Sequence, residues 1–98
     1  MYIVASTWEV LDGKLDEFVA NGNRMRKILM AHPGIESIQH FSSGEDEVMV
    51  IVGYSDEDSY NRLINDPEGP FVKGLKDIDL EKTARWKQSW RGNSLPGD

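Results

Sequence analysis

The stretch EVMVIVGY at residues 47–54 decides the fold of this chain of 98 residues. Its valines and isoleucine favour an extended backbone, which predicts a strand. Side chains alternate between the two faces of a strand, so Val50 points to one face and Met49 and Ile51 to the other. Both sets are apolar. Each face of the sheet that contains this strand must therefore be covered by other protein.

Outward from this strand, the pattern predicts three further strands and two helical regions. Residues 14–31 repeat apolar side chains at helical spacing, and Pro33 and Gly34 end that helix. Ser55 and Asp58 resemble a capping box that starts the second helix. The remaining expected elements are strands at residues 2–10, 35–41 and 82–91, a hairpin loop at 42–46 and a short helix at 70–75.

This order of elements predicts a ferredoxin-like βαββαβ domain of the α+β class, with a four-stranded antiparallel sheet and both helices on one face. Residues 1–91 form this single domain, and residues 92–98 form a loose C-terminal tail rich in turn formers. The open face would expose more apolar surface than monomers usually tolerate. We therefore expect a homodimer that buries the outer face of strand 47–54. A loop or tail lying over the sheet is the alternative.

Composition excludes several classes of function. The net charge of −6 repels a phosphate backbone, so we expect no nucleic-acid partner. With no cysteine, the chain cannot form a disulfide, a thiolate zinc site or a cysteine nucleophile. No apolar run is long enough to span a membrane and no basic signal sequence begins the chain, which predicts a cytoplasmic protein with no membrane partner. The nine glycines form neither GxGxxG nor a P-loop, so we expect no nucleotide cofactor.

Several segments of the chain carry a family resemblance. They are Thr7-Trp8-Glu9-Val10, His32-Pro33-Gly34, Glu36-Ser37-Ile38-Gln39-His40, and Tyr54-Ser55-Asp56-Glu57-Asp58 followed by Asp66-Pro67. In these segments the chain resembles the antibiotic biosynthesis monooxygenase-like proteins, a branch of the dimeric α+β barrel superfamily. The resemblance implies that two subunits press their open sheet faces together into a barrel. It also implies a small monooxygenase that needs no cofactor and oxidises an aromatic or quinol-type molecule.

His40 is the candidate catalytic residue. An imidazole titrates near neutral pH, so a His40 that faces a cavity could act as general base or hydrogen-bond donor. The alternative is a strand histidine hydrogen-bonded at the sheet edge or at the dimer seam. His32, just before Pro33, suits a structural role at the carbonyl end of a helix. The two histidines, with Glu36 between them, match no established metal spacing, so we expect no metal site.

The candidate binding residues are aromatic, because flat ligands stack on aromatic walls with a few polar anchors. We expect two or three of six aromatic residues to line a cavity, with Trp86 and Trp90 on the same face of the last strand. The six are Trp8, Tyr54, Tyr60, Phe71, Trp86 and Trp90. A cavity should open between the sheet and the helices, with residues 66–74 as a lid that moves at Gly69 and Gly74. The residues nominated for substrate binding are Trp8, Tyr54, Tyr60, Phe71 and Trp86.

One departure from the family pattern keeps a second function open. Members often carry a histidine late in the second helix, where this chain has Arg62, Leu63 and Asn65. This departure favours a non-catalytic dimer of the same fold that binds or senses a small molecule. Isomerase or lyase chemistry in a similar cavity is a third interpretation, because one fold hosts many reactions.

Overall fold

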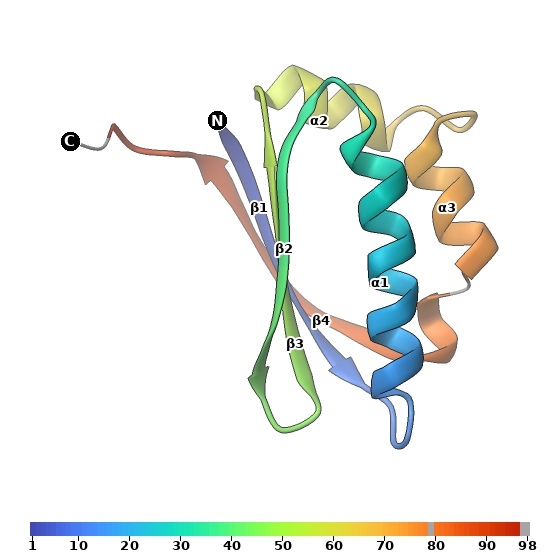
Figure 1. Cartoon of the computed structure of the whole chain (residues 1–98). Helices are drawn as coiled ribbons and strands as arrows, with labels where there is room; N and C mark the ends of the chain where they lie inside the picture. Colours follow the sequence, from blue (N-terminus) through green and yellow to red (C-terminus); the bar gives the residue numbers. More distant parts are fainter. Residues whose placement is uncertain (79, 97–98) are drawn as a thin grey trace.

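A computed structural model describes residues 1–78 and 80–96 of the chain (Figure 1). Its elements are β1 (Tyr2–Val10), α1 (Leu15–Met30), β2 (Ile35–Gly44), β3 (Glu47–Tyr54), α2 (Glu57–Ile64), α3 (Pro70–Ile78), the short 3-10 helix η1 (Leu80–Lys82) and β4 (Ala84–Asn93). The strands form one antiparallel sheet in the order β2-β3-β1-β4. All helices lie on one side of this sheet (Figure 1), which confirms the predicted ferredoxin-like α+β fold. None of the described helices is long and apolar enough to span a membrane.

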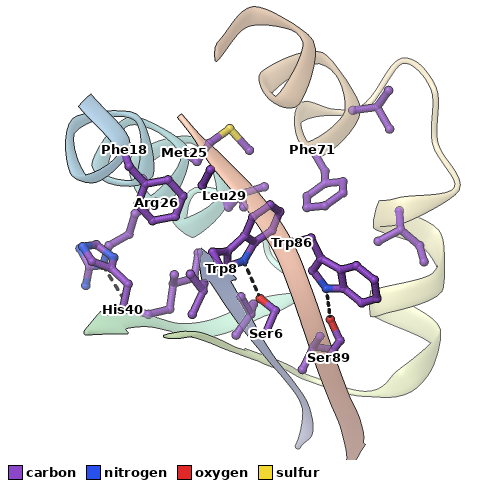
Figure 2. A pocket seen from close by; sticks show the side chains of 18 of the residues that line it. Ser6, Trp8, Phe18, Met25, Arg26, Leu29, His40, Phe71, Trp86 and Ser89 are labelled. Atoms are coloured by element: carbon purple, nitrogen blue, oxygen red, sulfur yellow. Dashed lines mark hydrogen bonds between the residues drawn. The ribbon is translucent and has the colours of Figure 1, made fainter. Parts of the chain in front are cut away.

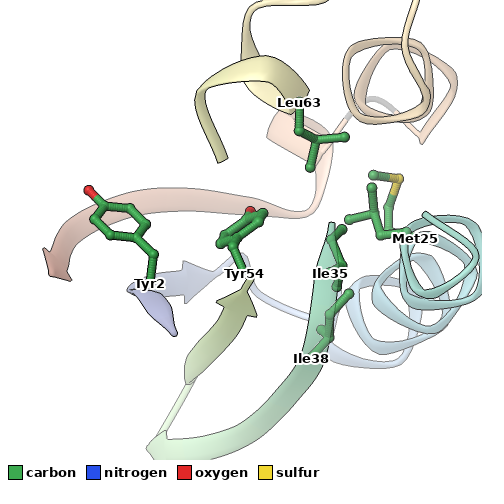
Figure 3. Close-up of a cluster of buried hydrophobic side chains, with 7 residues drawn as sticks. Tyr2, Met25, Ile35, Ile38, Tyr54 and Leu63 are labelled. Atoms are coloured by element: carbon green, nitrogen blue, oxygen red, sulfur yellow. The ribbon is translucent and has the colours of Figure 1, made fainter. Parts of the chain in front are cut away.

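The core lies between the sheet and the helices, in two clusters of buried apolar side chains. The larger cluster packs buried side chains of α1 and α2 against the sheet, as Figure 3 shows. The smaller one closes the other end of the sheet, where Phe18 of α1 packs with Val10, Val48 and Ala84. The members of the larger cluster are Tyr2, Met25, Leu29, Ile35, Ile38, Tyr54 and Leu63.

α3 packs against α1 at a glycine. Gly74 is buried, and a Cβ atom on it would lie only 2.5 Å from Sδ of Met25. The absence of a side chain therefore lets the two helices approach closely. We predicted Gly74 as a hinge of a lid, and this prediction is wrong because the residue lies inside a helix at a tight contact.

The start of α2 also differs from the prediction. Asp56 caps the helix: its Oδ1 accepts a hydrogen bond of 2.7 Å from the backbone N–H of Ser59. This bond holds the pKa of the Asp56 carboxyl below its ordinary value. Ser55, which the sequence suggested as the cap, instead donates to Oε1 of Glu36 at 2.7 Å. The capping box fails because Ser55 lies one residue outside the cap position.

The end of α1 has the structural histidine that the sequence predicted, with a different contact. Nδ1 of His32 accepts a hydrogen bond of 3.1 Å from the backbone N–H of Gly34. His32 therefore acts as a hydrogen-bond acceptor in the turn that follows α1.

The hairpin between β2 and β3 is tighter than predicted. β2 continues through Gly44, which pairs with Glu47, so only Glu45 and Asp46 connect the two strands. Asp46 has a φ of 56°, a left-handed conformation that two-residue hairpin turns commonly require. The loop predicted over residues 42–46 is therefore mostly strand.

β4 contains a β-bulge that simple alternation did not predict. The register with β1 shifts between Thr7 and Trp8, and Lys87 is the extra residue with no register partner on β1. The bulge reverses the faces of all residues that follow it. Trp86 therefore faces the helices, whereas Trp90 faces the other side of the sheet. The prediction that these two tryptophans share one face is wrong.

The outer face of the sheet, which carries no helix, has an apolar centre. The central strands contribute Ile3 and Ala5 from β1 and Met49 and Ile51 from β3. The edge strands add Phe41 and Trp90, whose side chains are 47 % and 48 % exposed. The two apolar faces predicted from residues 47–54 are therefore both present.

Candidate active site

A cavity of about 1000 Å³ lies between the sheet and the helical layer. The inner face of the sheet forms its floor, and α1 with the α2–α3 segment forms its opposite wall. This volume is at the upper end of what small-molecule sites usually offer. The helical wall consists of Phe18, Val19, Gly22, Met25, Arg26 and Leu29 from α1, and of Tyr60, Ile64, Phe71, Val72 and Lys76 from α2 and α3.

One row of register partners across the four strands of the floor carries a polar side chain on every strand but β3. His40 on β2 pairs with Val50 on β3, which pairs with Ser6 on β1, which pairs with Ser89 on β4. The flanking rows are mainly apolar or aromatic, and one of them places Trp8 opposite Trp86. A ligand lying on the floor would therefore meet three polar groups in one row, with Arg91 in the next row.

His40 lies at one end of this row, beside the β2 edge of the sheet. Figure 2 shows it at the same end of the cavity as Arg26, on the far side of Trp8 from Trp86. The Arg26 side chain is held there by a hydrogen bond of 3.3 Å from Nε to the carbonyl oxygen of Ile38. His40 thus faces the cavity and not the outer face of the sheet, which answers the question that the sequence left open.

Tyrosines fill the end of the cavity between α2 and the sheet. The ring of Tyr60 lies 5.1 Å from that of Tyr54 and 5.3 Å from that of Tyr2. Burial, with a smaller contribution from Tyr60, raises the pKa of Tyr54 to about 12. The Tyr54 phenol is therefore protonated at neutral pH and is no candidate for a general base. Arg91 covers this end, with its guanidinium carbon 5.9 Å from the centre of the Tyr60 ring.

The structure brings together every residue that the sequence nominated for the site. His40 and the five nominated aromatic residues all line the same cavity. The expectation that only two or three of the six aromatic residues would do so is wrong, because Trp90 alone of that set faces outward. The nominated residues found at the cavity are His40, Trp8, Tyr54, Tyr60, Phe71 and Trp86.

Sequence reasoning missed several polar residues of the site, among them Ser6, Arg26, Ser89 and Arg91. Ser6 shares a face with Trp8 by simple alternation, so this signal was available. Arg26 lies four residues after Gly22 and three before Leu29, which is helical spacing along the same wall. Ser89 and Arg91 had no such signal, because only the bulge at Lys87 turns them inward.

The charge around the cavity differs in sign from that of the whole chain. Among the described residues, four basic residues and one acidic residue line it, although the chain carries a net charge of −6; Arg85, the register partner of Glu9, has its side chain on the other face of the sheet. Within residues 1–78 and 80–96, no three histidine or acidic side chains gather in a way that could hold a metal ion. The basic residues are Arg26, Lys76, Arg85 and Arg91, and the acidic one is Glu81.

By sequence, the chain matches no protein-family model and no curated protein. Its structure, in contrast, resembles solved structures along nearly its whole length. SnoaB, a cofactor-independent oxygenase from Streptomyces nogalater, superposes with a TM-score of 0.79 at 13 % identity and covers 98 % of this chain and 94 % of its own. HapK from Hahella chejuensis superposes with a TM-score of 0.78, also at 13 % identity, over 100 % of this chain and 96 % of its own.

A solved antibiotic biosynthesis monooxygenase gives a TM-score of 0.75 at 11 % identity, over 98 % of this chain and 100 % of its own. The chain has the antibiotic biosynthesis monooxygenase-like fold. The family resemblance stated from short segments of sequence is thus confirmed at the level of the fold. In this monooxygenase-like fold, the chain encloses an aromatic cavity with an imidazole at one end and two serine hydroxyls on its floor.

Proposed function

We propose that this chain is a small monooxygenase that oxidises a flat aromatic molecule of the quinol type with dioxygen, without a bound metal or organic cofactor. The observation that carries the proposal is the aromatic cavity with His40 at one end, in a fold shared with a cofactor-independent oxygenase. Flat, weakly polar ligands suit such walls, because ring stacking and apolar burial bind them and a few polar groups orient them.

His40 is the proposed general base. Among the described residues that line the cavity, it is the one imidazole, and an imidazole can take a proton near neutral pH. Removing a proton from a quinol raises the electron density of its ring, which makes the anion a better reductant of dioxygen. The aromatic walls supply orientation and exclude water from the reacting atoms. Trp8, Tyr54, Tyr60 and Trp86, together with Phe71, hold the ring in place.

The proposed reaction balances without a further reductant. One quinol and one dioxygen give one hydroxyquinone and one water. The quinol loses two electrons when it becomes a quinone, and two more when a ring C–H bond becomes a C–OH bond. Dioxygen accepts all four electrons, one of its atoms entering the new hydroxyl group and the other leaving as water.

The chain is proposed to work as a homodimer. The outer face has an apolar centre on β1 and β3 and half-exposed Phe41 and Trp90 beside it. A second copy of the same face offers complementary apolar surface of equal extent, as in two-fold symmetric interfaces. An interface of this kind commonly buries about 2,000 Å² or more in total.

A non-catalytic binding or sensing dimer is the second candidate function. The observation in its favour concerns His40: within the described part of the chain, no carboxylate is hydrogen-bonded to its ring. A catalytic imidazole is commonly oriented by such a third group. This candidate predicts tight binding of an aromatic molecule and no oxygen consumption.

The test is oxygen uptake with a panel of hydroquinones, using labelled dioxygen and mass spectrometry of the product. We expect one labelled oxygen atom in the product and a loss of turnover of about 10²-fold or more in His40→Ala. His32→Asn is the matched control, because asparagine keeps an acceptor in the turn far from the cavity, and it should turn over normally. Binding without oxygen uptake would favour the sensing dimer. Turnover of His40→Ala at the wild-type rate would show that His40 is not the base.

A further inference from the structure

Two tryptophan–serine hydrogen bonds lie side by side on the floor of the cavity. Nε1 of Trp8 donates to Oγ of Ser6 at 3.0 Å, and Nε1 of Trp86 donates to Oγ of Ser89 at 2.8 Å (Figure 2). The two tryptophans are register partners on adjacent strands, and so are the two serines. The same pair of groups therefore occurs twice, once on β1 and once on β4.

The repetition depends on the bulge in β4. On β1 the two members are two residues apart, which places Ser6 and Trp8 on one face by regular alternation. On β4 they are three residues apart, and a regular strand would turn Trp86 and Ser89 to opposite faces. The extra residue Lys87 brings both to the cavity side. Bulges often aim a side chain at a site in this way.

The chemistry of the two groups leaves each serine with a proton to donate. An indole N–H can only donate, so the serine oxygen must accept, and its own O–H remains available. Within residues 1–78 and 80–96, no protein group accepts a hydrogen bond from Ser6 or Ser89. Accepting a bond from the indole polarises each hydroxyl and makes it a stronger donor. The Trp8–Ser6 bond is half-buried in a mainly apolar cavity, where such a bond is stronger than in water, whereas the Trp86–Ser89 bond is exposed.

The positions of the serines define what they can reach. Ser6 and Ser89 are directly opposed, and their Cβ atoms are about 4.5–5.5 Å apart in such a pair. One acceptor oxygen can therefore receive hydrogen bonds from both. His40 lies in the same row two strands beyond Ser6, which is about 9.5 Å at the usual strand spacing.

We propose that Ser6 and Ser89, each held and polarised by a tryptophan, form a paired donor site for one oxygen atom of the ligand. The acceptor is a quinone carbonyl or the phenolate oxygen that becomes one. This inference rests on the proposed quinol-type ligand. It adds that the ligand carries an acceptor oxygen on the side away from His40. When a proton is removed near His40, the negative charge spreads through the conjugated ring to this oxygen, where the two serine hydroxyls stabilise it.

The proposal is tested by ligand binding, which does not depend on turnover. The probe is lawsone, a hydroxyquinone and therefore of the same class as the proposed product. Because it is already a quinone, it cannot serve as the quinol substrate of the proposed reaction. Its reference is naphthol, which has the same fused rings and a hydroxyl group but no carbonyl. Calorimetric titration should show that lawsone loses about 3- to 10-fold in affinity in Ser6→Ala or Ser89→Ala, and about 10- to 100-fold in the double variant. Naphthol should lose less than about twofold, since both probes stack on the same walls.

Two further variants separate hydrogen bonding from packing. Ser43→Ala removes an exposed hydroxyl outside the cavity, which donates to Glu47 at 3.0 Å, and should leave both probes unaffected. Trp86→Phe keeps the Ser89 hydroxyl but removes the group that polarises it, so its effect on lawsone should be smaller than that of Ser89→Ala. An equal loss for lawsone and naphthol in the serine variants would mean that the serines only position the indoles, and the proposal would be wrong. It would also be wrong if the wild-type protein binds lawsone no more tightly than naphthol, or binds neither.

Failure of the paired donor site can be distinguished from failure of the proposed monooxygenase function. If the protein binds lawsone through the serines but consumes no oxygen with any quinol, the donor site is supported and the proposed monooxygenase function is wrong. If the protein consumes oxygen and the double serine variant binds lawsone as tightly as the wild type, the monooxygenase function is supported and the donor site is wrong.

Discussion

The two faces of the sheet are both largely apolar, yet they distribute their polar groups in opposite ways. On the outer face the centre is apolar apart from the buried Thr7, with Ile51 and Ala5 on the middle strands, and the amides of Gln39 and Gln88 lie on the edge strands. On the inner face a polar row crosses the centre, with Ser6 on a middle strand. An apolar centre with a polar rim suits a protein partner. Polar groups in the centre of an apolar cavity suit a small ligand that must be oriented.

The largest expected effect is on the outer face. Ile51→Asp should convert the proposed dimer to a monomer, because a buried, unpaired carboxylate at the centre of the interface would raise the dissociation constant about 10³-fold or more. Since Ile51 points away from the helices, the fold should survive, and circular dichroism checks this. Light scattering at micromolar concentration measures the mass. Gln39→Asp, at the rim beside it, is the control and should remain dimeric. A wild-type protein that scatters as a monomer contradicts the proposed dimer.

The next effect belongs to the inner face and concerns pH. The folded protein holds the phenolic proton of Tyr54 more tightly than the unfolded chain, with a pKa of about 12 against 10.0. Its stabilising contribution is therefore complete below pH 10 and is lost as the pH rises from 10 to 12. The free energy of unfolding should fall over this window by about 2 kcal/mol more in the wild-type protein than in Tyr54→Phe. Urea unfolding across the window measures the difference, and parallel curves for the two proteins would refute it.

The smallest expected effect compares the two tryptophans that the bulge sends to opposite faces. Trp86→Leu should weaken the binding of an aromatic ligand about 10-fold with little change in unfolding, because it removes a stacking surface that is 58 % exposed at the cavity. Trp90→Leu should leave that affinity unchanged and weaken the dimer instead. Quenching of the remaining tryptophan fluorescence by lawsone measures the affinity of both. If both substitutions weakened lawsone binding equally, the assignment of the two faces would be wrong.

Much of the fold could be predicted from periodicity. The apolar stripe along α1 and the two-sided apolar pattern of β3 predicted how many layers the domain has and that both sheet faces need covering. The aromatic residues of the site could be nominated because so short a chain offers few polar residues as alternative candidates for binding a ligand. Helix ends were less predictable, since Ser55 and Asp56 are both good caps and only the backbone direction decides which one is used.

The sequence alone determined the ferredoxin-like order of elements, the two apolar faces of β3 and the choice of His40 as the imidazole to examine, because all three follow from local spacing and residue chemistry. Only the tertiary structure decided that Ser89 and Arg91 face the cavity and that Trp90 does not. The reason is Lys87: whether a residue is accommodated as a bulge depends on the register of β4 against β1, a contact between the two ends of the chain. Alternation within one strand carries no information about such a shift.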